Sequence, residues 1–183
     1  MNPLATSEMT IEPATADDLD CIVQIAGVSF TSPWTKKMFE AELSGNPFAS
    51  LVTARRRTGE DIPEATSAIV GYLCYWVVFE ELRLMDLAVD PRLRRRGVAR
   101  MLVTHALGSA RASGALRAVL EVRASNQPAQ ALYEQFGFRF VTRRANYYTH
   151  PTEDAILMEL APLASSYRSG NTQITFDQGG DVC

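Results

Sequence analysis

The stretch V-D-P-R-L-R-R-R-G-V-A-R, residues 89–100, decides how this chain is interpreted. A strand-like segment ends at Asp90-Pro91, because proline cannot continue a strand ladder, and a helical pattern begins at Gly97. Free N–H groups at a helix start, helped by the helix dipole and by arginines, form an anion site suited to a pyrophosphate. Gly97 lets a phosphate approach the backbone, and the small Ala99 avoids a clash. A solvated basic helix cap explains the same charge run equally well.

The segments after this turn alternate between helices and strands. Apolar residues recur at helical spacing from Gly97 to Ser113, and Gly114 stands where a C-terminal cap glycine belongs. We expect further elements in this order: a strand buried on both faces at Leu116–Val122, a helix at Ala129–Phe136 ended by Gly137, and strands at Phe138–Thr142 and Ala155–Leu160.

The segments before the turn predict short elements of the same kinds. A strand at Thr10–Pro13 precedes a helix capped near Thr15 or Asp17. Thr35 can cap a second helix that buries Met38, Phe39 and Leu43. The remaining expectations are strands at Ser50–Arg55, around Tyr72–Val77 and at Leu82–Asp90, a loop at Arg56–Thr66 and a turn at Glu80-Glu81.

This order of elements predicts an α/β sandwich whose central sheet is mixed in direction, mostly antiparallel, and flanked by helices. We assign residues 10–162 to one domain. Residues 1–9 are expected to be a disordered N-terminus, and residues 163–183 a polar, disordered tail. With 183 residues, of which 46% are hydrophobic, the chain has material for one core.

Charge and cysteine content restrict the partners. The net charge of −3 provides no basic field for nucleic acid. Cys21, Cys74 and Cys183 are widely spread and read as reduced thiols. The apolar run Ile69–Phe79 is far shorter than the roughly 20 residues that cross a bilayer, and no charged opening of a secretory signal is present. We therefore expect a cytoplasmic protein with no nucleic-acid or membrane partner. No metal is expected either, because His105 and His150 lack surrounding ligands.

Two blocks of sequence resemble one family. Arg94-x-x-Gly97-x-Ala99 matches the acetyl-CoA pyrophosphate loop of GNAT acetyltransferases, written Q/R-x-x-G-x-G/A. The series L-E-V-R-A-S-N (120–126), A-L-Y-E-Q-F-G-F (131–138) and N-Y-Y (146–148) resembles, within that superfamily, the bacterial ribosomal-protein-alanine acetyltransferases. The resemblance covers about residues 10–160. It implies a GNAT-type sandwich, acetyl-CoA as co-substrate and the N-terminus of a ribosomal protein as acceptor.

The resemblance also implies where acetyl-CoA binds. Backbone groups of Leu87, Ala88 and Val89 would pair with the pantetheine amides, and the Val89 N–H would polarise the thioester carbonyl. Asn126 would lie at the pantetheine or phosphate arm, although its residue type alone equally suggests a helix N-cap. The pyrophosphate would be held by the turn itself, that is by Arg94, Arg95, Arg96, Gly97, Val98, Ala99 and Arg100.

Two side chains are candidates for the chemistry, which requires a neutral amine and a proton for the departing thiolate. Glu121 is a lone carboxylate in an apolar strand, and the residues alone favour an ion pair with Arg123 on the same face. The resemblance instead implies that Glu121 accepts the proton of the amine, through water. Tyr133 is by default a packing residue; the resemblance implies that it protonates the leaving thiolate.

The acceptor is expected in a groove between the Phe30–Thr35 connection and a loop at Asn146–His150. Phe30, Trp34, Tyr147 and Tyr148 are its candidate contacts, with core packing as the alternative for Trp34 and both tyrosines. The stretch 149–152 looks longer than the usual loop of the family. Acidic residues nearby could attract a basic protein terminus or be ordinary surface: Glu42, Glu80, Glu81 and Asp86.

The acid–base properties of amines favour an N-terminal acceptor. An α-amino group has a pKa of about 7.7–8.0 and a lysine of about 10.4, so the α-amine is far more often neutral near pH 7. The sequence thus predicts an acetyl-CoA-dependent N-acetyltransferase that acts on the N-terminal amine, of alanine, of a ribosomal protein. A GNAT enzyme for a lysine or small-molecule amine, and a catalytically silent acetyl-CoA-binding module, remain alternatives. Retention of both Glu121 and Tyr133 argues against the silent module.

Overall fold

The computed structural model of the protein describes residues 9–56 and 68–163. The strands are β1 (Met9–Pro13), β2 (Ala49–Arg56), β3 (Ala68–Val78), β4 (Glu81–Val89), β5 (Arg117–Arg123), β6 (Arg139–Thr149) and β7 (Thr152–Leu160). The α-helices are α1 (Leu19–Ser29), α2 (Lys36–Ser44), α3 (Val98–Ala112) and α4 (Gln127–Gln135), and two short 3-10 turns, η2 (Ala16–Asp18) and η4 (Pro91–Leu93), precede α1 and α3.

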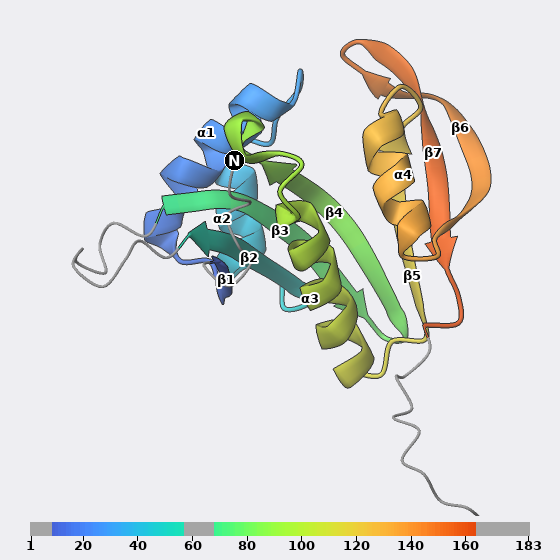
Figure 1. Ribbon diagram of the computed structural model, residues 1–183, viewed down its shortest axis with the longest axis horizontal. Helices are drawn as coiled ribbons and strands as arrows, with labels where there is room; N and C mark the ends of the chain where they lie inside the picture. The colour runs from blue at the N-terminus through green and yellow to red at the C-terminus, as the bar shows by residue number, and fades with distance from the viewer. Residues whose placement is uncertain (1–8, 57–67, 164–183) are drawn as a thin grey trace, which may run out of the picture.

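All seven strands form one sheet, in the order β1-β2-β3-β4-β5-β7-β6. Neighbouring strands are antiparallel except β4 and β5, which are parallel. Helices α1 and α2 cover one face, and α3 and α4 cover the other (Figure 1). The predicted mixed, mostly antiparallel sandwich is therefore confirmed.

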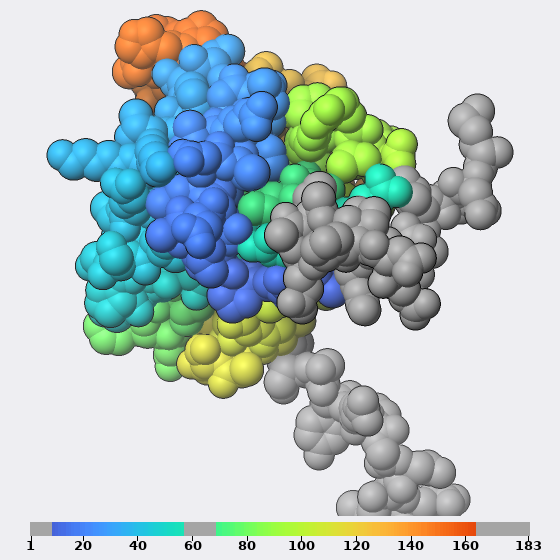
Figure 2. All heavy atoms as spheres, turned by 90° about the vertical axis from the view of Figure 1, so that its left-hand side faces the viewer, coloured from blue at the N-terminus to red at the C-terminus, as the bar shows by residue number. Residues whose placement is uncertain are grey.

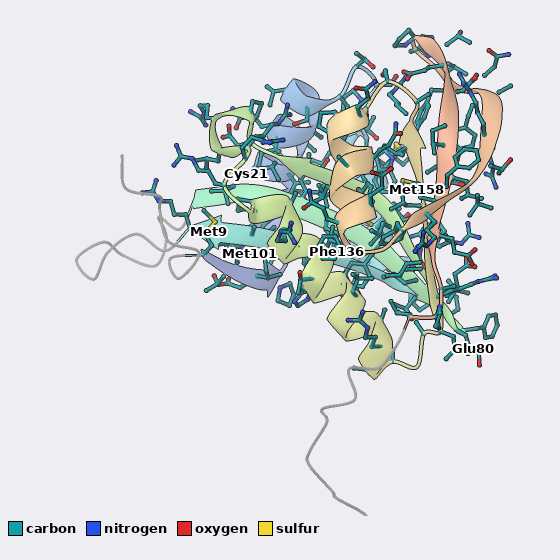
Figure 3. The ribbon with its side chains drawn as sticks, turned by 45° about the vertical axis from the view of Figure 1, so that its right-hand side comes forward. Met9, Cys21, Glu80, Met101, Phe136 and Met158 are labelled. Carbon is teal, nitrogen blue, oxygen red and sulfur yellow. The ribbon has the colours of Figure 1, made fainter. Side chains whose placement is uncertain are left out.

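Each face of the sheet has its own apolar core. Leu102 and Ala106 of α3 pack with Leu82 and Leu120 of the strands. This core continues under α4, where Met158 of β7 is buried (Figure 3). On the opposite face, Ile22 of α1 and Phe39 of α2 pack on β3 and β4. Strand β4 thus has α3 on one face and α1 on the other.

Helix ends agree with their sequence signals. Thr15 makes a capping box with Asp18 at the start of η2, and the Thr35 hydroxyl accepts a hydrogen bond from the Met38 N–H. Gly114 and Gly137, which follow α3 and α4, have φ of 87° and 93°, in the left-handed region that glycine adopts without a Cβ clash. The expected caps and stops are confirmed at these four positions.

Strand β6 differs from the prediction. It extends to Thr149, and Tyr148 and Thr149 pair with Glu153 and Thr152 of β7, so the expected loop at Asn146–His150 is mostly strand. In the stretch 149–152, Thr149 pairs with Thr152, so that residues 150 and 151 form a tight turn. Almost every β6 residue is exposed, because β6 is an edge strand, and the apolar alternation that marks a half-buried strand is missing.

The interpretation of β5 was also wrong in one respect. Ala118, Leu120 and Val122 are buried, whereas Glu121 and its neighbours on the opposite face are only partly buried. The strand therefore alternates like any strand with one covered face, and Glu121 points away from α3 and α4.

Several smaller expectations need correction. Met38 is 45% exposed, because it lies on the outer side of α2 while Phe39 fills the core. Met9 and Leu163, assigned above to the loose ends, are buried parts of the fold. The turn before β4 lies one residue earlier than predicted, since Glu81 already belongs to the strand. Most of the predicted loop Arg56–Thr66 and nearly all of the tail fall outside the described residues.

Two further features concern cysteines and membranes. Cys21 and Cys74 are free thiols, the first exposed and the second buried. Within residues 9–56 and 68–163, no helix has the length and apolar character needed to span a bilayer.

Candidate active site

The sheet forks between β4 and β5. Their ladder runs from Glu81 opposite Arg117 to Leu84 opposite Leu120, and the strands then diverge (Figure 1). On its other edge β4 stays paired with β3 as far as Val89. The end of β4, including the predicted Leu87, Ala88 and Val89, thus has one edge that β5 leaves open. Such an edge offers backbone N–H and C=O groups to an extended ligand.

The basic turn follows directly from this open edge. Arg95 and Gly97 have φ of 62° and 86°. Turns with left-handed residues direct successive N–H groups toward one concavity, which suits an anion. Helix α3 begins at Val98, and its ladder begins with the Met101 N–H donating to the Gly97 carbonyl oxygen. The N–H groups of the first turn, including those of Val98 and Ala99, therefore lack helical acceptors.

The arginines of the turn have different surroundings. Arg94 links the turn to the end of β4 and to α1. Its Nε donates to the Val89 carbonyl oxygen at 3.1 Å, and its Nη2 donates to Ser29 Oγ at 3.1 Å. Arg95 and Arg96 are exposed, and neither forms an ion pair with a described residue. Two guanidinium groups are thus free to face a pyrophosphate.

Arg100 lies one turn into α3 and contacts α4. Its guanidinium lies 5.6 Å from the centroid of the Phe136 ring and donates to Gln135. Figure 3 labels Met101 on α3 and Phe136 at the end of α4. The structure therefore gives Arg100 a role in joining the two helices.

Glu121 lies on β5 one residue beyond the last pair with β4. Its Oε1 accepts a hydrogen bond from Arg144 Nη1 at 2.9 Å. The ion pair with Arg123 expected from the sequence is wrong, because Arg123 pairs with Glu153 at 3.1 Å. Glu121 also lines an open hollow of about 220 Å³, together with Arg83 and Val141, on the face turned away from α3 and α4.

Tyr133 approaches the fork from the opposite face. It projects from α4, is 8% exposed, and packs edge-on against Phe138 with ring centroids 5.7 Å apart. Burial raises the pKa of Tyr133, and the negative charge of Asp86 raises it further. The phenol therefore stays protonated near neutral pH, as a proton donor must.

Asn126 is the N-cap of α4. Its side-chain oxygen accepts a hydrogen bond from the Ala129 N–H at 3.2 Å. The structure thus assigns Asn126 the capping role that its residue type suggested.

The predicted acceptor contacts divide into two groups. Trp34 packs on Phe39, with ring centroids 5.3 Å apart, and Phe30 is also partly buried against that core. Tyr147 is 48% exposed, and its ring meets that of Tyr148 edge-on at 5.2 Å. Core packing therefore accounts for the first pair, whereas Tyr147 has the surface available for a ligand.

Arg123 has a larger structural role than its position in the sequence indicates. Its guanidinium lies 4.1 Å from the centroid of the Tyr148 ring and donates to the carbonyl oxygens of His150 and Pro151. One side chain thus fixes the end of β6 and the turn into β7. An arginine directly after the expected apolar strand Leu116–Val122 was the available signal.

The two expected walls of the acceptor groove touch each other. The Thr31 hydroxyl, between α1 and α2, donates to the His150 carbonyl oxygen at 3.0 Å. Figure 2 shows the tip of the β6–β7 hairpin, in orange, beside the pale blue segment that joins α1 to α2. Of the acidic residues expected near the groove, Glu80 and Glu81 lie instead at the opposite end of β4, beside the start of β5 (Figure 3), where Glu81 pairs with Arg83 and Arg117. Glu42 accepts a hydrogen bond from Trp76.

Known proteins resemble this chain in sequence and in fold. Residues 19–138 match the family described as the Acetyltransferase (GNAT) family. A ribosomal protein bS18-alanine N-acetyltransferase from Salmonella typhimurium is 37% identical over 155 residues, which cover 82% of this chain and 96% of that protein. Its counterpart from Escherichia coli is 33% identical over 153 residues, with 82% and 96% covered.

Solved structures agree with these sequence matches. The crystal structure of the Escherichia coli ribosomal-protein-S18-alanine N-acetyltransferase superposes with a TM-score of 0.72 at 31% identity, covering 87% of this chain and 97% of that chain. The fold is also shared by Arabidopsis thaliana NAA60 in complex with acetyl-CoA, with a TM-score of 0.73 at 19% identity and coverage of 84% and 98%. From its sequence, its forked sheet and these relatives, the chain is a member of the GNAT family of acetyltransferases.

Proposed function

We propose that this protein transfers the acetyl group of acetyl-CoA to the N-terminal α-amino group, of alanine, of a ribosomal protein. The observation that carries the proposal is the fork between β4 and β5, which leaves one edge of β4 open directly before the turn into α3 and starts next to Glu121 of β5. The acceptor class rests on the relatives, which are named for the alanine of ribosomal protein bS18.

The turn and the open edge fit acetyl-CoA. Exposed Arg95 and Arg96 and the first N–H groups of α3 would hold its pyrophosphate, and the free edge at Leu87–Val89 would pair with its pantetheine arm. Acetyl-CoA supplies the acetyl group as a thioester. The Val89 N–H would stabilise negative charge on the thioester oxygen.

The proposed proton transfers use one residue from each side of the fork. Glu121 would accept the proton of the α-amine through a water molecule, with Arg144 orienting its carboxylate. Tyr133, protonated because its pKa is raised by burial, would donate to the departing sulfur. The exposed Tyr147 would cover the backbone of the acceptor peptide. We place the reaction in the cytoplasm.

A pair of peptides tests the proposal. A short peptide that begins with alanine and carries one lysine would be incubated with the purified protein and acetyl-CoA, beside the same peptide with its N-terminus already acetylated. We expect mass spectrometry to show one acetyl group added to the first peptide only. Acetylation of the blocked peptide would instead identify a lysine acetyltransferase, and acetyl-CoA binding without any transfer would identify a silent module.

A second measurement addresses the natural acceptor. Intact-mass spectra of the ribosomal proteins of the host, with and without this chain, should differ by one acetyl group on a protein that begins with alanine. Identical spectra would contradict the proposed acceptor.

A further inference from the structure

Asp86 carries a carboxylate near the fork, and the proposed mechanism assigns it no role. It lies on β4, next to a bulge at Met85, opposite Cys74 of β3. Its Oδ2 accepts a hydrogen bond from the hydroxyl of Tyr72 at 2.9 Å. No arginine, lysine or histidine among residues 9–56 and 68–163 forms an ion pair with it. The neighbouring Glu121, in contrast, has Arg144.

An uncompensated carboxylate in such a place is costly. Removal from water raises the pKa of Asp86 to about 6, although the hydrogen bond from Tyr72 lowers it. Near pH 7 the Asp86 carboxyl is therefore mostly ionised. Its negative charge is stabilised by a hydrogen bond from a neutral group, the hydroxyl of Tyr72. Buried charges are normally paired. A cation supplied from outside the described residues would stabilise the ionised carboxylate.

The surroundings of Asp86 show where that cation would lie. Trp34, Phe39 and Tyr72 form a row of rings in tilted and edge-on contact, with successive centroids 5.3 Å apart. The row leads from the α1–α2 connection to the carboxylate, which Tyr72 contacts. Across the fork, the charge of Asp86 acts on Tyr133 of α4. Asp86 itself is partly exposed. It thus lies between the expected acceptor groove and the expected proton donor.

We propose that Asp86, oriented by Tyr72, is the counter-ion that binds the α-ammonium group of the acceptor. The inference rests on the proposed function and adds to it an acceptor-binding residue. The unblocked N-terminus of a protein is a cation at neutral pH, and a charge-assisted hydrogen bond in a partly desolvated site is strong and directional. Proton loss from the bound ammonium remains the task assigned to Glu121.

Other titratable groups do not take this role. Tyr72 and Cys74 of β3 and Tyr133 of α4 face Asp86, and burial raises the pKa of all three, so they are neutral near pH 7. Helices α1 and α2 contribute apolar side chains to the same core, among them Ile22, Ala26 and Phe39. The carboxylate of Glu42 on α2 also acts on Cys74, but it already accepts hydrogen bonds from the side chains of Asn46 and Trp76. Asp86 accepts one hydrogen bond within the described residues, from Tyr72, and is therefore the better candidate.

Calorimetry tests the inference without catalysis. Protein saturated with coenzyme A would be titrated with the free alanine-starting peptide and with its N-terminally acetylated form. Asp86→Asn keeps the size of the side chain and removes its charge. We expect the free peptide to bind about 10- to 100-fold more weakly to Asp86→Asn, as for loss of a hydrogen bond to a charged group. The acetylated peptide should bind equally to both proteins, because it carries no α-ammonium.

Two controls keep the test decisive. Asp20→Asn removes one carboxylate from an exposed ion pair with Lys36 and should leave both affinities unchanged. In the wild-type protein, which avoids any folding defect of a variant, affinity for the free peptide should fall as the pH drops below about 6. Tyr72→Phe should move this midpoint to higher pH, because the hydrogen bond that lowers the pKa is lost.

The outcomes separate the two proposals. Unchanged affinity of Asp86→Asn for the free peptide, or a wild-type affinity that is flat from pH 5 to 8, overturns the inference, even if the wild-type protein acetylates alanine normally. If the wild-type protein binds both peptides alike and transfers nothing, the proposed function fails as well. A drop confined to the free peptide supports the counter-ion.

Discussion

The hydroxyl of Thr31 and the backbone carbonyl of His150 form a hydrogen bond of 3.0 Å that joins segments 119 residues apart in the sequence. Arg123 holds the same carbonyl from β5 at 3.1 Å. The α1–α2 connection, the β6–β7 hairpin and the strand of Glu121 are thereby fixed relative to one another. These contacts set the separation of the two walls expected for the acceptor groove.

Replacing Thr31 should consequently affect the acceptor and not the cofactor. In Thr31→Val the shape is kept but the donor is lost. A neutral hydrogen bond contributes about 0.5–1.5 kcal/mol, so we expect KM for the peptide to rise about 2- to 10-fold, with the affinity for acetyl-CoA unchanged. Steady-state kinetics and calorimetry check the two quantities. Thr10→Val, at the distant edge strand β1, serves as the control, and an equal change in both variants would contradict the assignment.

Glu121→Gln should reduce turnover. The amide keeps a hydrogen-bond acceptor for Arg144 but cannot take a proton, and loss of a general base lowers the rate by about 10²–10⁴-fold. The measurement is kcat with acetyl-CoA and the alanine-starting peptide, at saturation with both. Glu159→Gln, on β7 and lining the same hollow, provides a matched loss of charge and should turn over normally. Near-normal turnover of Glu121→Gln would remove the proposed role.

Tyr133→Phe distinguishes chemistry from packing. The phenyl ring retains the contact with Phe138, so the fold and the cofactor site should persist, whereas the proton donor is lost. We expect kcat to fall at least tenfold, about the lower range for a lost acid, with less than a twofold change in the Kd of acetyl-CoA. Tyr75→Phe removes a hydroxyl from another buried tyrosine and should change neither. A parallel loss of kcat and of cofactor binding would indicate that Tyr133 acts through packing.

The sequence predicted those parts of the fold that local rules determine. Thr35 and Gly114 mark helix ends by side-chain capping and by positive φ, both readable from the residue type. The strands and helices around the fork also follow from apolar periodicity. Local signals therefore place the end of β4 directly before the basic turn and the start of α3.

The rest depends on which strands become neighbours. Arg144 reaches Glu121 because β6 lies beyond β7, at the edge of the order β5-β7-β6, and no spacing along the chain encodes that order. The same topology turns Arg123 toward Glu153. Strand β6 itself is stabilised by its ladder with β7 and not by an apolar face, so its polar sequence resembles a loop.

The raised pKa of Asp86 leads to a last prediction, on stability. In the unfolded chain this carboxyl has a pKa near the model-peptide value of 3.8, and in the folded protein about 6. Between these values the native state binds more protons than the unfolded state, so the contribution of this group to stability falls as the pH rises. A shift of about two units corresponds to about 3 kcal/mol as an upper bound.

Asp86→Asn should therefore be more stable than the wild-type protein above pH 6, by about 1–3 kcal/mol. The difference between the two should shrink as the pH falls from 6 to 4, because wild-type Asp86 becomes protonated and neutral like the amide. Urea unfolding of both proteins at pH 4, 5, 6 and 7.5 measures this difference in the free energy of unfolding. The other carboxylates contribute equally to both proteins, so their contributions cancel. A pH-independent difference would show that the charge of Asp86 is not the cause. A variant that is more stable but binds the free N-terminus weakly is what is expected if Asp86 is retained for recognition at the expense of stability.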